Sequence, residues 1–187
     1  MKNDIEIIQA IADKKERALA ALYDLYADKV YNTALSYTKK AEDAEEITQD
    51  VFVKIYQNAA SFQGKSSVST WIYRIAVNTS LNYLKKNNRF TFFKQNLTGT
   101  PTVTFEHPGV LLENKENAAT LYQVMDGLPN NQKTAFILSY IEELPRQEVA
   151  DIMETSLKAV ESLLQRAKKN MRVALEKLYP HRRKSKK

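Results

Sequence analysis

The chain contains no cysteine among its 187 residues, which excludes disulfide bonds, thiol catalysis and thiolate metal sites. Its two histidines, His107 and His181, are far apart in the sequence, so no metal site and no other cofactor is expected. Glycine and proline are scarce, at four and five residues. Because a β-sandwich or β-barrel needs a turn about every 8–12 residues, these folds are not expected.

The chain also lacks an apolar run long enough to span a membrane, and it opens without a signal-like segment. A cytoplasmic protein without membrane insertion is therefore expected. Apolar residues recur at the spacing of amphipathic helices, as at Ala44, Ile47, Val51 and Ile55, and the sequence predicts an all-α fold. Helices are expected at about residues 4–12, 16–38, 42–59, 70–89, 113–126, 130–142, 146–153 and 157–178.

One segment interrupts this helical pattern. Pro101 and Pro108 lie in a stretch that also holds two of the four glycines, and proline in a helix interior breaks the helix. The sequence therefore predicts two small helical domains, residues 1–94 and 113–180, joined by an irregular linker over residues 95–112. A basic tail follows at residues 181–187.

The distribution of charge is more informative than the net charge of +6. Residues 61–100 carry six basic residues, seven aromatic residues and no acidic residue. Bases of single-stranded nucleic acid stack on aromatic rings while cations contact the phosphates, so this composition favours a nucleic-acid surface. For any single ring, a place in the core is the more ordinary role. A polar stripe along one predicted helix consists of Arg74, Asn78, Asn82, Lys85 and Arg89.

The second predicted domain has the pattern of a helix-turn-helix. A short helix from Arg146 to Met153 is followed by a three-residue turn and a longer helix from Leu157. Ser156 is a good N-cap for the longer helix, because its hydroxyl can accept a free backbone N–H. Short helix, turn and capped long helix are typical of DNA-binding domains, although a plain helical hairpin shows the same pattern.

Three segments resemble the conserved regions of bacterial sigma factors. Residues 43–56, DAEEITQDVFVKIY, resemble region 2.2, and residues 69–78, STWIYRIAVN, resemble the following region, which meets the promoter −10 element. Residues 128–133, LPNNQK, and residues 148–168 are similar to region 4. Because the segments follow in this order with no intervening domain, the chain resembles the extracytoplasmic-function (ECF) group of the sigma-70 family.

The resemblance implies a dissociable subunit of RNA polymerase that binds core enzyme and directs promoter-specific initiation. It implies that the first domain opens the −10 element and holds the melted non-template strand, with a flipped base captured near residues 64–70. The second domain would read the −35 element in duplex DNA. It also implies an anti-sigma factor as a partner and leaves catalysis to the polymerase, so no catalytic residue is expected.

The positions that match the family's motifs give three sets of candidate residues. The candidate polymerase-binding residues are Asp43, Glu46, Gln49, Asp50 and Lys54. The candidate residues for the −10 element are Lys65, Ser69, Thr70, Trp71, Tyr73, Arg74, Asn78, Lys85, Lys86 and Arg89. The candidate residues for the −35 element are Ser156, Lys158, Ser162, Gln165, Arg166 and Lys169.

The sequence departs from the family's pattern in the helix-turn-helix. The turn often carries glycine, but Met153 and Glu154 occupy that place, which predicts a turn without a left-handed residue. Glu161 and Leu163 stand where the family frequently has basic residues. The alternative function is a one-component helix-turn-helix regulator. An enzyme is not expected, because the sequence has no glycine-rich phosphate loop and no nucleophile motif.

Overall fold

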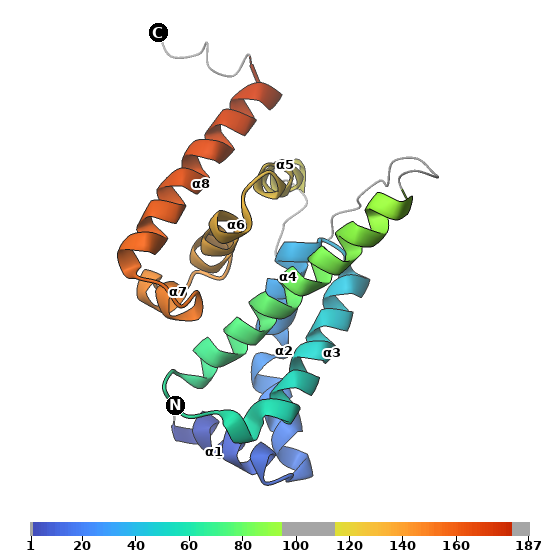
Figure 1. Ribbon diagram of the computed structural model, residues 1–187, viewed down its shortest axis with the longest axis vertical. Helices are drawn as coiled ribbons and strands as arrows, with labels where there is room; N and C mark the ends of the chain where they lie inside the picture. Colours follow the sequence, from blue (N-terminus) through green and yellow to red (C-terminus); the bar gives the residue numbers. More distant parts are fainter. Residues whose placement is uncertain (1, 95–114, 181–187) are drawn as a thin grey trace. The chain divides into compact units, whose positions relative to one another are not determined.

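The computed structural model describes residues 2–94 and 115–180, and every regular element within these two ranges is a helix (Figure 1). The all-α prediction is therefore confirmed. The predicted linker at 95–112 and the basic tail at 181–187 lie outside the described residues. The chain divides into two compact units, Met1–His107 and Pro108–Lys187.

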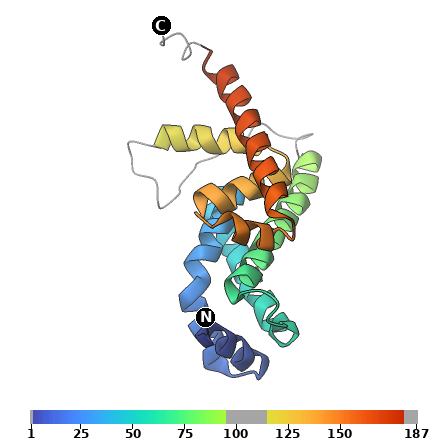
Figure 2. The same ribbon diagram turned by 90° about the vertical axis from the view of Figure 1, so that its left-hand side faces the viewer.

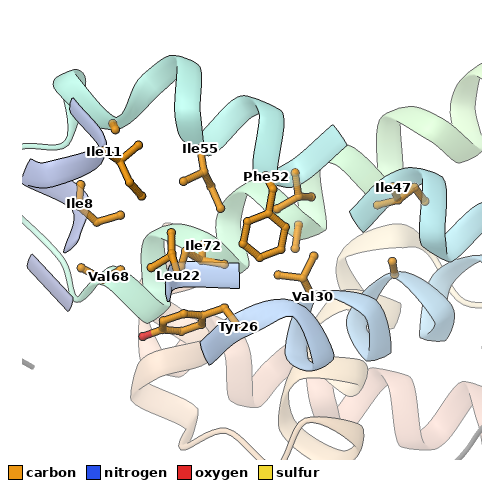
Figure 3. Close-up of a cluster of buried hydrophobic side chains, with 14 of the residues drawn as sticks. Ile8, Ile11, Leu22, Tyr26, Val30, Ile47, Phe52, Ile55, Val68 and Ile72 are labelled. Carbon is orange, nitrogen blue, oxygen red and sulfur yellow. The ribbon is translucent and has the colours of Figure 1, made fainter. Parts of the chain in front are cut away.

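Over residues 2–94, the first unit is a bundle of four helices, in which α2 packs against α1, α3 and α4. Its core takes apolar side chains from each helix, such as Ile8 of α1, Leu22 of α2, Phe52 of α3 and Ile72 of α4 (Figure 3). The predicted apolar stripe of α3 is buried throughout. The elements are α1 (Lys2–Ala12), α2 (Glu16–Thr38), α3 (Ala41–Asn58), a 3₁₀ turn η1 (Ala59–Ser61) and α4 (Val68–Lys94).

The second unit is built around α8, against which α5, α6 and α7 pack. Figure 2 shows α5 lying across α8 rather than alongside it. Pro129 and Pro145 directly precede α6 and α7, as expected for a residue whose missing N–H costs nothing at a helix start. The elements are α5 (Lys115–Asp126), α6 (Asn130–Phe136), a π-helical turn η3 (Ile137–Ile141), α7 (Arg146–Ile152) and α8 (Leu157–Leu178).

The helix expected over residues 130–142 widens in its second half. After α6 the backbone forms η3, where the Glu142 N–H donates to the Ile137 carbonyl oxygen at 3.0 Å, five residues back. Ile137 and Leu138 are both fully buried in this turn. A wider turn changes the direction in which successive side chains point, and regular helical spacing does not predict it.

The prediction of a turn without a left-handed residue is wrong. Glu154 has a φ of 51° between α7 and α8. The Thr155 N–H donates to the Ala150 carbonyl at 3.0 Å, and the Glu154 N–H donates to the Asp151 carbonyl at 3.3 Å. This pair of bonds is a Schellman motif, which ends a helix with one left-handed residue. The chain therefore adopts the usual turn geometry with glutamate in the glycine position.

Candidate nucleic-acid interface

A polar seam joins α3 to α4 along one edge of the first unit. The Tyr83 hydroxyl of α4 lies 2.9 Å from Asp43 Oδ1 and 3.2 Å from Glu46 Oε2, and donates to these two carboxylates of α3. Burial raises the pKa of Tyr83 to about 12, and the two carboxylates contribute to the increase. The phenol therefore remains a hydrogen-bond donor throughout the neutral pH range.

The same seam continues two turns further along α3. Lys54 Nζ donates to Thr79 Oγ1 of α4 at 2.9 Å, and the lysine side chain is half-buried. Gln49 and Asp50 are exposed on α3. Three residues of the candidate polymerase-binding set therefore contact α4, and one of them, Glu46, is exposed like Gln49 and Asp50. The sequence pattern alone did not separate the contacting residues from the other two.

The start of α4 is held by a hydroxyl pair. Ser67 Oγ accepts the Thr70 N–H at 3.0 Å and lies 2.8 Å from Thr70 Oγ1, so Thr70 is buried in the helix start. The Trp71 ring packs on Phe62 with a centroid distance of 5.1 Å and is half-buried. Lys65 is exposed, Ser69 is half-buried and Tyr73 is buried.

The predicted polar stripe lies along α4, as the helical spacing requires. Asn78, Asn82 and Lys85 are exposed on it and Arg74 is half-buried. Lys86 is exposed as well, whereas the side chain of Arg89 lies outside the described residues. Because residues 61–100 contain no acidic residue, this stripe supplies a surface of amides and cations that suits phosphate and base edges.

The long helix of the second unit has the geometry of a recognition helix. Ser156 Oγ accepts the Ala159 N–H at 3.2 Å, which confirms the predicted N-cap. Val160, Leu164, Ala167 and Met171 are buried on one side of α8, and Leu163 is half-buried. The candidate −35 residues lie on the other side of the helix. Lys158, Gln165, Arg166 and Lys169 are exposed there together with Ser156, and Ser162 is half-buried.

Three contacts of cationic side chains in the second unit, at Arg146, Lys168 and Lys133, were not predicted from the sequence. Arg146 Nη1 of α7 lies 3.8 Å from Glu161 Oε1 of α8. Lys168 Nζ lies 4.7 Å above the ring of Tyr140, and its hydrogen bond lowers the pKa of that phenol. These contacts join α8 to α7 and η3. Glu161, one of the two exposed acidic residues of α8, is thereby paired with a cation.

The third contact is made by a buried lysine. Lys133 of α6 is 6% exposed, and its Nζ lies 2.9 Å from Asp126 Oδ1. Burial lowers the pKa of Lys133 to about 8. No signal in the sequence marks this lysine, because the neighbouring polar residues Gln132 and Thr134 give it the appearance of a surface position.

Within residues 2–94 and 115–180, no group of three or more His, Asp or Glu side chains could hold a metal ion. No helix in the same ranges is both long and apolar enough to cross a membrane.

Comparison with known proteins decides the family. The family profile Sigma-70 region 2 matches residues 22–90, and the profile Sigma-70 region 4 matches residues 118–171. The RNA polymerase sigma factor YlaC of Bacillus subtilis is 32% identical over 163 residues, covering 84% of this chain and 94% of that protein. The chain belongs to the sigma-70 family. The ECF RNA polymerase sigma factor SigW of Bacillus subtilis is 28% identical over 179 residues, covering 91% and 96% of the two chains, and the chain is of the ECF group.

Two solved structures share the fold. CnrH, solved in complex with the cytosolic domain of CnrY, gives a TM-score of 0.67 at 18% identity, covering 92% of this sigma factor and 97% of CnrH. RpoE of Bartonella quintana, solved with the anti-sigma factor NepR, gives 0.65 at 18% identity, covering 88% and 98%. Region 2 of this sigma factor thus covers most of α2, all of α3 and most of α4, and region 4 covers α7 and most of α8.

Proposed function

We propose that this ECF sigma factor binds core RNA polymerase and directs promoter-specific initiation with two separate DNA-reading domains. The observation that carries the proposal is the match of regions 2 and 4, in that order, to the two units of the chain. Residues 1–94 form the domain for core binding and the −10 element, residues 95–112 the linker, and residues 113–180 the domain for the −35 element. Membership of the sigma-70 family favours this function over a one-component regulator.

The first domain uses two adjoining helices for two partners. The acidic face of α3, with the candidate set around Asp43, Glu46 and Asp50, binds core polymerase. The exposed stripe of α4, with Arg74, Asn78 and Lys85, binds the melted non-template strand. The absence of acidic residues from 61–100 supports the second assignment, because phosphate repels carboxylates.

The second domain reads duplex DNA through α8. Side chains in the first turns of a recognition helix contact base edges, while cations further along contact phosphates. Ser156, Lys158, Ser162 and Gln165 are the base-edge candidates by this rule, and Arg166 and Lys169 hold phosphates. The exposure of five of these six side chains supports the assignment.

The protein has further expected partners and an expected place of action. Catalysis is left to the polymerase, so the protein acts by binding, in the cytoplasm where transcription takes place. An anti-sigma factor is proposed as a regulator, because RpoE of the same fold was solved with one.

The proposal is tested by a transcription assay with purified core RNA polymerase and a pool of randomised promoters. We expect specific transcripts whose templates share two conserved sequence boxes upstream of the start. Duplex DNA binding without core binding and without transcripts would instead place the one-component regulator ahead.

The −10 assignment has its own test. We expect Arg74→Ala and Asn78→Ala to reduce permanganate reactivity of the melted strand at least threefold while core affinity stays unchanged. Lys29→Ala, an exposed lysine of α2, is the matched control. Unchanged melting in both stripe variants would remove α4 from the DNA interface.

A further inference from the structure

Tyr83 contacts two residues of the face that we propose binds polymerase, although it lies on the neighbouring helix and some 40 residues away in the sequence. From this geometry we infer that Tyr83 is a positioning residue for polymerase binding, which holds Asp43 and Glu46 in the orientation that the polymerase recognises. The inference rests on the proposed function and adds a residue to it.

The two carboxylates need such a donor. Asp43 and Glu46 are three residues apart on one face of α3, where like charges repel each other. The Tyr83 hydroxyl reaches both, at 2.9 and 3.2 Å. An ionised carboxylate offers about four lone-pair sites, so each group keeps acceptor sites for a partner after the single proton of the phenol is shared.

The position of the hydroxyl is fixed by its surroundings. The Tyr83 ring packs against the apolar core of the first unit, and the Lys54–Thr79 hydrogen bond joins the same two helices along the seam. A side chain ordered before binding loses less conformational freedom on association. Tyr83 therefore restricts Asp43 and Glu46 in the free protein, and the restriction favours the complex.

The charge of α3 indicates the chemistry of the group that is bound. The exposed or half-exposed acidic residues of α3 outnumber its single lysine, and that lysine is directed to Thr79. The matching groups on the polymerase are cationic, and arginine fits best because its planar guanidinium pairs with carboxylate oxygens in a fixed geometry.

The test is the dissociation constant of full-length protein for core RNA polymerase, measured for Tyr83→Phe. The substitution removes the hydroxyl and keeps the ring, so the core packing is retained. We expect a three- to tenfold weaker complex. Tyr26→Phe is the matched control, because the Tyr26 hydroxyl donates to Asp4 Oδ2 at 3.0 Å within the same unit but outside the seam, and we expect it to leave the dissociation constant unchanged.

A double-mutant cycle separates positioning from a general structural role. In an Asp43→Ala, Glu46→Ala background, measured at low salt, Tyr83→Phe should cost less than 1.5-fold, whereas in an Asp50→Ala background it should keep its full effect. A loss that persists without the two carboxylates, an unchanged complex or a tighter one would each overturn the inference. Failure of the unmodified protein to bind core enzyme would instead refute the proposed function.

Discussion

At the scale of single residues, Lys133 stands apart from the other lysines whose side chains the structure describes, because its ammonium group is buried beside Asp126. Burying a cation costs solvation free energy, and the interaction with the half-exposed carboxylate of Asp126 offsets only part of that cost. The lowered pKa of about 8 expresses this cost. The residue therefore makes the stability of the second unit depend on pH.

The sign of that dependence follows from the two protonation states. In the unfolded chain Lys133 has its ordinary pKa of 10.5, and in the folded chain its pKa is about 8. Between these values the unfolded chain holds more protons, so the contribution of Lys133 to the free energy of unfolding rises with pH. We expect Lys133→Met to raise the free energy of unfolding by about 1 kcal/mol at pH 7 and by less as pH approaches 10.

Lysine Cε chemical shifts measured by NMR against pH check this prediction directly, since one lysine should titrate near pH 8. Asp126→Ala is the companion variant. It leaves the buried ammonium without its carboxylate and should lower the free energy of unfolding by about 1–2 kcal/mol. Titration of every lysine above pH 10 would contradict the account.

Glu154 is a second residue that lowers the stability of the folded chain, because its backbone is left-handed. A left-handed conformation costs a non-glycine residue about 1–2 kcal/mol, and glycine adopts it freely. A glycine at this position would therefore stabilise the folded chain, but part of this stabilisation is lost because glycine is more flexible in the unfolded chain. We expect Glu154→Gly to raise the free energy of unfolding of the helix-turn-helix by about 0.5–1 kcal/mol.

Hydrogen exchange of the α8 amides measures this gain in the second unit alone. The matched control is Glu148→Gly in the first turn of α7, where the backbone is helical and glycine should cost about 1 kcal/mol. Equal destabilisation by both substitutions would show that the turn does not need a left-handed residue.

At the scale of elements, the longer helices could be predicted because apolar residues recur along them at helical spacing. The α3 stripe of Ala44, Ile47, Val51 and Ile55 is an example, because apolar residues at this spacing lie on one face of a helix, and that face is buried. The N-cap at Ser156 could be predicted for a similarly local reason. The widening at η3 and the left-handed Glu154 could not, because both depend on how the chain packs rather than on the nearest residues.

The residues of the candidate site also divide into those whose placement follows from local spacing and those whose placement depends on packing. The polar stripe of α4 could be predicted from the spacing of three or four residues between Arg74, Asn78, Asn82 and Lys85. The burial of Thr70 and Tyr73 could not, nor could the bond from Tyr83 to Asp43, which joins residues 40 positions apart. Contacts of that kind arise only when two helices meet in a definite register.

The exposed cations of α8 give a prediction for that element. If Lys169 holds a phosphate, Lys169→Ala should weaken binding to all duplex sequences alike and reduce the slope of log affinity against log salt by about 1. Fluorescence anisotropy over a series of salt concentrations measures the slope. Lys177→Ala, exposed two turns further along α8, should leave it unchanged, and a loss confined to one base pair would instead make Lys169 a base-reading residue.

At the scale of the whole molecule, the two proposed functions lie on units that each have their own core. Acidic residues gather on α3 in the first unit, and exposed cations gather on α8 in the second. A charge change on one unit should therefore leave the binding partner of the other unaffected. Core binding and −35 binding are separable by this argument.

Asp50→Arg tests that separation. We expect at least a tenfold loss of affinity for core polymerase, because the substitution reverses a charge on the exposed face of α3, with no change in binding to a −35 duplex. Core affinity is measured by titration and the fold by circular dichroism. Asp24→Arg makes the same charge change on the exposed surface of α2 and should keep core affinity within twofold, whereas a parallel loss of duplex binding in Asp50→Arg would contradict separate surfaces.

The packing of Trp71 on Phe62 has a practical consequence. The chain contains a single tryptophan, and it lies at the start of the helix that we propose holds the melted strand. A tryptophan analogue excited at longer wavelength, incorporated into this chain alone, would emit light separately from the tryptophans of the polymerase. Base stacking near the indole would quench that emission. The time course of the fluorescence would therefore report when the promoter opens.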